Sequence, residues 1–152
     1  MPGYLQIGHD PTKWWFEQPI DASQLTKQPL SIQVGAPVVG LIVLSPRFHS
    51  AVTFHQSSEA PPLYQDVSVP TIYVPTTDGV PEGHVGYELP DSADLDQLAS
   101  EITALMRDGH SQTITLRSDA PHRTLVLDGA TLAFAVLCEQ WPPVIRDSSQ
   151  HG

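Results

Sequence analysis

The segment 82–88, Glu-Gly-His-Val-Gly-Tyr-Glu, is the stretch of this sequence whose residue types are best suited to chemistry. In an extended strand Glu82, His84 and Glu88 project from one face, because successive side chains alternate between faces. Residues two apart on a strand are about 7 Å apart, so the side chains of Glu82 and His84 can converge. A carboxylate beside an imidazole can fix the ring tautomer, raise the imidazole pKa or help to hold a divalent cation. Asp78, on the preceding loop, could join them.

This segment therefore gives the catalytic candidates His84, Glu82 and Glu88, and the metal-ligand candidates Asp78, Glu82 and His84. A small metal-dependent enzyme or a small-molecule-binding protein centred on these residues is one hypothesis. The simpler interpretation of the same pattern is a polar strand edge that faces solvent. The two interpretations differ in whether removal of the His84 imidazole abolishes ion binding or activity.

The seven histidines raise the question of a metal site elsewhere. The chain contains neither a His-x-His nor a His-Glu-x-x-His motif. His49 and His55 share one face of a predicted strand, but their positions lie about 20 Å apart along it. Since zinc–nitrogen bonds are about 2 Å long, both rings can bind one ion only where the chain bends sharply between them. Solvated or capping histidines are the simpler interpretation.

Cys138 is the single cysteine, which excludes an internal disulfide framework and a multi-cysteine metal site. It follows the apolar run 132–137 and precedes Glu139, whereas a reactive thiolate needs an open, electropositive setting. We therefore expect a buried core cysteine. The sequence also lacks a Gly-x-Ser-x-Gly motif and a phosphate-binding glycine loop. These observations favour a protein that is not an enzyme, and we predict no cofactor.

The segment 13–16, Lys-Trp-Trp-Phe, concentrates large aromatic side chains near the N-terminus. In an extended chain Trp14 and Phe16 point one way and Trp15 the other, so burying all three requires cover on both sides. Tryptophan is enriched among the residues that dominate binding energies. The segment can dock on its own core, on a second subunit or on another protein. We take Trp14, Trp15 and Phe16 as the partner-binding candidates.

The chain is strongly acidic, and its charge is uneven. Seventeen Asp and Glu against seven Lys and Arg give a formal charge of −10, which argues against binding to a phosphate backbone. We therefore expect no nucleic-acid partner. The stretch 78–108 holds eight acids and one opposing base, Arg107. It can attract a protein with a basic surface, or it can serve as solubilising surface and helix N-terminal charge.

Length and composition indicate one globular domain. The 152 residues are 40% apolar and 16% charged, enough for a hydrophobic core without metals or disulfides. The longest nearly continuous apolar run, 36–44, is far shorter than the roughly 20 residues that span a bilayer. The first six residues do not have the pattern of a secretory signal, so we predict a cytoplasmic protein without a membrane partner.

One amphipathic helix is predicted over about 93–107. Apolar residues recur there at helical spacing: Leu95, Leu98, Ala99, Ile102, Leu105 and Met106. Asp91 or Ser92 can cap the start, and Gly109 can supply a left-handed exit after Arg107.

Strands are predicted around this helix. Alternating or short apolar patterns occupy 31–34, 38–44, 48–55, 71–74, 85–89, 113–116 and 124–127. Asp128-Gly129 favours a two-residue type I′ turn, which would pair 124–127 with a return strand at 130–138. A buried helix over 130–140 is the alternative, because the alanine and leucine content also suits one.

The sequence therefore predicts an α+β fold, a mostly antiparallel sheet of about seven short strands with the helix packed on one face. We expect a single domain over residues 1–141, with an aromatic arm over about 1–20 and a tail at 142–152. The favoured function is a non-catalytic interaction or accessory protein. Its expected partners are a second copy of itself, in a homo-oligomer, and another protein with a basic surface.

Overall fold

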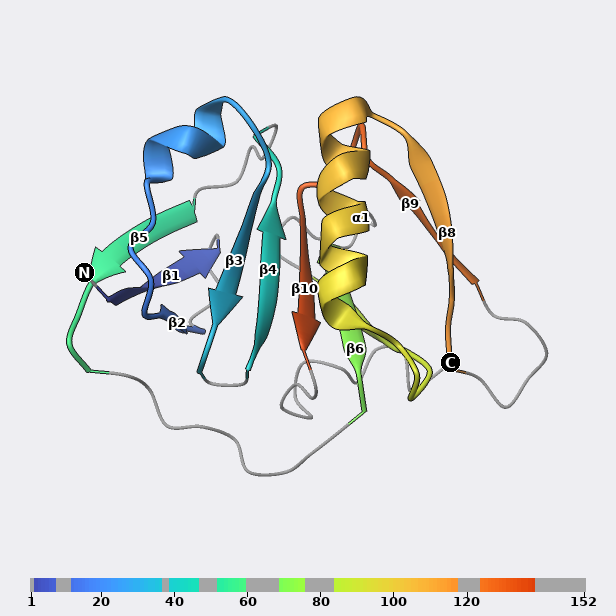
Figure 1. Ribbon diagram of the computed structural model, residues 1–152, viewed down its shortest axis with the longest axis horizontal. Helices are drawn as coiled ribbons and strands as arrows, with labels where there is room; N and C mark the ends of the chain where they lie inside the picture. The colour runs from blue at the N-terminus through green and yellow to red at the C-terminus, as the bar shows by residue number, and fades with distance from the viewer. Residues whose placement is uncertain are drawn as a thin grey trace.

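Antiparallel β-sheet makes up most of the structure, and one long helix lies against it (Figure 1). The computed structural model describes residues 2–7, 12–36, 39–46, 52–59, 69–75, 84–117 and 124–138. Within these ranges the chain forms ten strands, one α-helix and one 3-10 helix. Each strand pair among them is antiparallel. The predicted α+β class is confirmed, with more strands than expected.

The central sheet has five strands in the order β3–β4–β10–β6–β7. They are β3 (Leu30–Val34), β4 (Gly40–Leu44), β6 (Thr71–Pro75), β7 (His84–Glu88) and β10 (Phe134–Cys138). The three inner strands are buried along almost their whole length. Strands that are apolar on both faces need a covering layer on each side. The remaining elements supply these two layers.

A three-stranded sheet, with the order β2–β1–β5, covers one face of the central sheet. It consists of β1 (Gly3–Ile7), β2 (Trp14–Phe16) and β5 (Val52–Gln56), and the 3-10 helix η1 (Ala22–Thr26) follows β2. The side chains buried here form the sheet–sheet core, made of Leu5, Trp14, Phe16, Ile32, Val34, Ile42, Leu44, Tyr73, Phe134, Val136 and Cys138. Cys138 is fully buried, as predicted.

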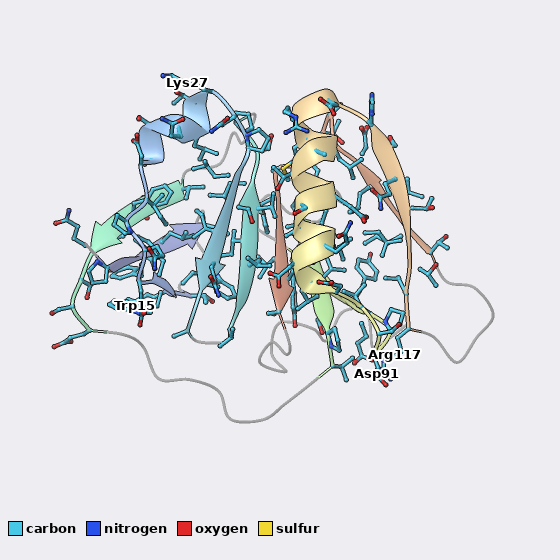
Figure 2. All side chains as sticks on the ribbon, in the orientation of Figure 1. Trp15, Lys27, Asp91 and Arg117 are labelled. Atoms are coloured by element: carbon cyan, nitrogen blue, oxygen red, sulfur yellow. The ribbon has the colours of Figure 1, made fainter. Side chains whose placement is uncertain are left out.

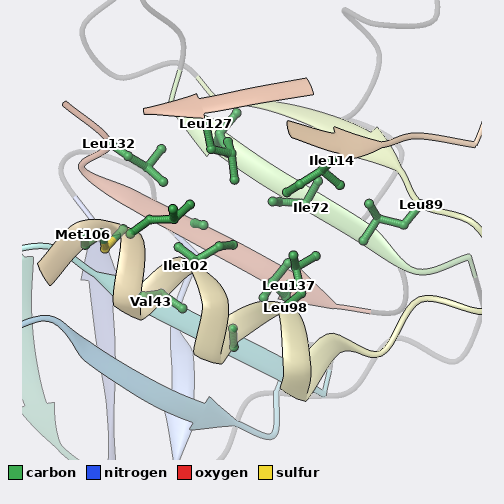
Figure 3. Packing of buried hydrophobic residues seen from close by; sticks show 14 of the residues in the cluster. Val43, Ile72, Leu89, Leu98, Ile102, Met106, Ile114, Leu127, Leu132 and Leu137 are labelled. Carbon is green, nitrogen blue, oxygen red and sulfur yellow. The ribbon is translucent and has the colours of Figure 1, made fainter. Parts of the chain in front are cut away.

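Helix α1 (Leu95–Asp108) and a ribbon of two strands, β8 (Ser111–Thr115) and β9 (Thr124–Asp128), cover the opposite face. The helix lies over β3, β4 and β10 (Figure 1). The second core, between helix, ribbon and central sheet, contains Val43, Ile72, Val74, Leu89, Leu98, Ala99, Ile102, Leu105, Met106, Ile114, Leu116, Leu127, Leu132, Ala135 and Leu137 (Figure 3). The structure therefore has three layers, with the central sheet in the middle.

The predicted helix is confirmed, but its start was assigned to the wrong residue. Asp94 has extended backbone and accepts a hydrogen bond from the backbone N–H of Gln97, so it is the N-cap in place of Asp91 or Ser92. At the other end Gly109 has a φ of 72°, the left-handed conformation expected after Arg107. The apolar stripe faces the helix-side core, which is why its spacing was visible in the sequence.

Each of the eight predicted strand regions contains a strand, whereas β1 and β2 were not predicted as strands. β2 is only three residues long and all three of its side chains are buried, so it shows no alternation of apolar and polar residues. The β2 backbone forms hydrogen bonds on both of its edges. One edge pairs with β1, and on the other Trp15 forms a β-bridge with Ala36. This pairing places the predicted aromatic arm inside the fold.

The predicted hairpin at Asp128-Gly129 is wrong. A strand does form within the predicted return strand 130–138, at Phe134–Cys138, and the described residues 130–138 form no helix. β9 pairs with β8, whereas β10 pairs with β4 and β6. The Asp128 carboxylate and carbonyl accept bonds from the backbone of 130–132 and turn the chain away into the central sheet. Gly129 is needed for space, because a Cβ there would clash with the carbonyl oxygen of Leu105 at the end of α1.

Candidate functional site

The structure describes only part of the predicted Glu82–His84–Glu88 cluster. Asp78 and Glu82 lie outside the described residues. His84 begins β7 opposite Pro75, and its side chain is also outside the described part. Glu88 ends β7 opposite Thr71 and is partly buried. Among the described residues no three His, Cys, Asp or Glu side chains form a group that could hold a metal ion. Chemistry at this cluster stays a prediction.

The three aromatic partner-binding candidates lie within the fold of their own chain. Trp14, Trp15 and Phe16 are 1%, 7% and 6% exposed. Trp14 and Phe16 belong to the sheet–sheet core, and the Phe16 ring makes an edge contact with Phe54. The Trp15 backbone donates to Ala36 O and accepts from Gly35 N, both at 2.9 Å. Of the alternatives open from the sequence, these contacts match an arm docked on its own core.

Trp15, labelled in Figure 2, lies directly opposite Tyr4 of β1. Tyr4 belongs to a small group of aromatic and polar side chains on this sheet. The rings of Tyr4 and His55 stack with centroids 4.7 Å apart, and the Lys13 ammonium is 5.1 Å from the Tyr4 centroid. His55 Nε2 also lies 3.1 Å from the Thr53 hydroxyl. These side chains bind one another across β1 and β5, so they stabilise the register of this sheet.

Four of the described acids in the stretch 78–108 have partners within the chain. Asp94 caps α1, Asp91 contacts the Arg117 guanidinium, and Asp108 lies 3.5 Å from Arg107 Nε. Glu101 accepts bonds from two glutamine side chains, Gln97 at 3.0 Å and Gln112 at 2.6 Å. These hydrogen bonds, with Gln112 first, hold the pKa of the Glu101 carboxyl below its usual range. These four acids thus serve local structure.

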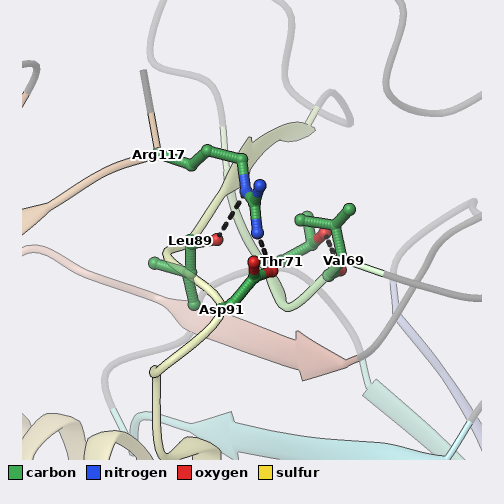
Figure 4. Close-up of polar contacts among 5 residues, drawn as sticks. All are labelled: Val69, Thr71, Leu89, Asp91 and Arg117. Atoms are coloured by element: carbon green, nitrogen blue, oxygen red, sulfur yellow. Dashed lines mark hydrogen bonds and ion pairs between the residues drawn. The ribbon is translucent and has the colours of Figure 1, made fainter. Parts of the chain in front are cut away.

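Arg117 attaches the β8–β9 ribbon to the end of the central sheet (Figure 4). Its backbone N–H donates to Glu88 O at 2.9 Å, and its Nε donates to Leu89 O at 3.2 Å. Its guanidinium also pairs with Asp91. The residues just after β8 therefore lie beside the end of β7, while β8 and β9 are each an edge strand of their two-stranded sheet among the described residues.

The ribbon has one buried face and one exposed face with very little charge. Leu127 and Ile114 point into the helix-side core. The exposed face carries Ser111, Thr113, Thr115, Thr124, Val126 and Asp128. Val126 is 63% exposed and lies directly opposite Thr113. Asp128, at one end, is the one charged residue among these six. Among the described residues, Val126 and Val39 are the large apolar side chains that are strongly exposed.

The outer edge of β9 is open within the described part of the chain, where β8 is its hydrogen-bonded neighbour. Such an edge presents N–H and C=O groups to any strand that approaches, and proteins commonly protect it with lysine or proline. Residues 124–128, Thr-Leu-Val-Leu-Asp, contain neither. An exposed valine on an open edge makes β9 the described surface best suited to association with another strand.

Sequence reasoning did not identify this surface because it assigned 124–127 to a hairpin with 130–138. Under that assignment the neighbour of 124–127 would have been 130–138 in place of β8. The alternation of Thr124, Val126 and Asp128 with two leucines was visible and does predict one exposed face. The missing information was which strand pairs with β9, and this depends on contacts that are distant in sequence.

Comparison of the chain with protein-family models, with curated proteins and with solved structures found no match to any of the three. Among the described residues, no helix has the length and apolar character needed to cross a membrane.

Proposed function

We propose that this chain is a non-catalytic protein that acts by association, and that the β8–β9 ribbon is its contact surface. The observation that carries the proposal is the 63% exposure of Val126 on a strand whose outer edge is open among the described residues. Fully burying a valine side chain contributes about 1.5–3 kcal/mol, so covering Val126 favours association. A strand added at the edge also satisfies backbone N–H and C=O groups.

The charge distribution supports the same surface. A formal charge of −10 repels a second copy over most approaches. The exposed face of the ribbon has one carboxylate, Asp128, at its end. The ribbon is therefore a place where two acidic molecules can meet with little repulsion. A two-stranded ribbon is also marginally stable alone, and additional strands would stabilise it.

The test is the molecular mass in solution, measured by light scattering or native mass spectrometry over a range of concentrations. We expect a wild-type mass that is a multiple of the chain mass, and a single-chain mass for Val126→Lys, because the ammonium would be buried at the contact. Val39→Lys is the matched control, since Val39 is 58% exposed but lies outside the ribbon. It should retain the wild-type mass.

Two results would contradict the proposal. One is a wild-type mass of a single chain at every concentration. The other is an assembly whose mass is unaffected by Val126→Lys, which would place the contact on a different surface.

A further inference from the structure

We infer that the partner of the ribbon is a second copy of this chain, with β9 pairing antiparallel to β9 of that copy across a two-fold axis at Val126. The two ribbons then form one sheet in the order β8–β9–β9–β8. This inference rests on the proposed function and deepens it, because it names the partner and fixes the register. Two-fold contacts of this kind are the commonest in homo-oligomers.

The sequence of β9 is self-complementary in this register. With the axis at Val126, the valine lies beside its own copy, and Thr124 lies opposite Asp128 of the second copy. Leu125 likewise lies opposite the second Leu127, so apolar residues meet on the buried face. The hydroxyl of Thr124 can donate to the carboxylate opposite it. Along the contact between the two β9 strands, apolar side chains thus lie opposite apolar ones and polar side chains opposite polar ones.

The same register keeps the two carboxylates apart. Each Asp128 is two residues from the axis, on opposite sides, so the pair is separated by about 13 Å along the strands. At physiological ionic strength the Debye length is about 8 Å, and the repulsion between them is largely screened. A shift of the register that brought the two Asp128 residues opposite each other would bring like charges together and would uncover Val126.

β5 also forms the edge of its sheet among the described strands, but it is a poorer match. Thr53 and His55 form its exposed side, and both are engaged in the contacts around Tyr4. Its apolar side chains, Val52 and Phe54, face the sheet–sheet core. Pairing along β5 would therefore cover no strongly exposed apolar group, whereas pairing along β9 covers two valines.

Single cysteine substitutions in β9 test the register of the proposed β9–β9 pairing. Val126→Cys should form a covalent dimer under mild oxidation, because each thiol lies beside its own copy. Thr124→Cys and Asp128→Cys should each remain uncrosslinked when alone. After the two are mixed and allowed to exchange subunits, they should crosslink to each other. The wild-type chain is the control, since Cys138 is fully buried and should not react.

Asp128→Cys removes the carboxylate that accepts from Ala130 N, so its fold is checked by circular dichroism and thermal unfolding before mixing. Val126→Cys leaves that turn unchanged and tests the axis independently. A dimer that gives no crosslink at Val126→Cys overturns the register, and so does crosslinking of Thr124→Cys alone to the same extent as the mixture. A single-chain mass for the wild type would instead overturn both this register and the proposed function.

Discussion

Gly86 of β7 lies directly opposite Tyr73 of β6, and the Tyr73 ring occupies the space that a side chain at position 86 would need. A Cβ at Gly86 would lie 2.5 Å from Tyr73 Cε2, closer than carbon atoms approach in proteins. Tyr73 is fully buried in the sheet–sheet core, so its ring has little room to move. The glycine is therefore a packing requirement of the central sheet.

Gly86→Ala should lower the free energy of unfolding by about 1–3 kcal/mol, the usual cost of overpacking a core. Chemical denaturation measures the change. Gly35→Ala is the control, because a Cβ there would contact Trp15 Cδ1 at an ordinary 3.9 Å. Equal losses for both variants would mean that the Tyr73 ring does not limit position 86.

Asp94→Ala should destabilise the protein by about 0.5–2 kcal/mol, because the first turn of α1 loses its capping acceptor. Ser92→Ala is the matched control, since Ser92 lies just before the helix and should change stability by less than about 0.5 kcal/mol. Thermal unfolding distinguishes the two. A larger loss for Ser92→Ala would return the cap to the position first expected from the sequence.

The bonds from Gln112 and Gln97 favour the ionised form of Glu101, so the pKa of Glu101 in the folded protein is below its unfolded value. Their contribution to stability is fully present above about pH 4.3 and is lost as the pH falls through the lower folded-state pKa. Gln112→Ala should therefore be less stable than wild type near neutral pH, with the difference shrinking in acid. Denaturation at a series of pH values tests this. A difference that stays constant with pH would show that the Glu101 charge is not involved.

Arg117→Ala should destabilise the protein by about 1 kcal/mol, because the side-chain bond to Leu89 O and the ion pair with Asp91 are both lost. Asp91→Ala removes the ion pair alone, and since Asp91 is largely exposed it should cost less. Hydrogen exchange in 111–115 should become faster in Arg117→Ala than in Asp91→Ala. The opposite order would assign the attachment of the ribbon to the ion pair.

Trp14→Ala should cost about 3–5 kcal/mol, as expected when a fully buried aromatic side chain is removed from a core. The size of this loss separates a structural role from a binding role. Trp14→Ala that folds as stably as wild type, and loses only association, would restore the arm as a partner-binding segment. Denaturation together with the solution mass gives both readouts.

The sequence predicted elements whose pattern is local and missed relationships that depend on distant contacts. The helix was clear because six apolar residues repeat at helical spacing, and β3 was clear because it alternates. Asp128-Gly129 was misleading because it is also a local pattern. A dipeptide that favours a turn does not determine whether the strands on either side of it pair with each other. The pairing of β9 with β8, and of β10 with β4 and β6, places Val126 at an edge.

The strand at the middle of the central sheet, β10, is made after both of its neighbours, β4 and β6. During synthesis the edges of β4 and β6 that pair with β10 therefore stay without this partner until the chain has passed residue 138. Strand pairs that are distant in sequence form slowly. The apolar surface and the unpaired strand edges are therefore exposed to other molecules for longer. A chain cut short before β10 could not complete the central sheet, so β4 and β6 reach their final pairing only after β10 has been made.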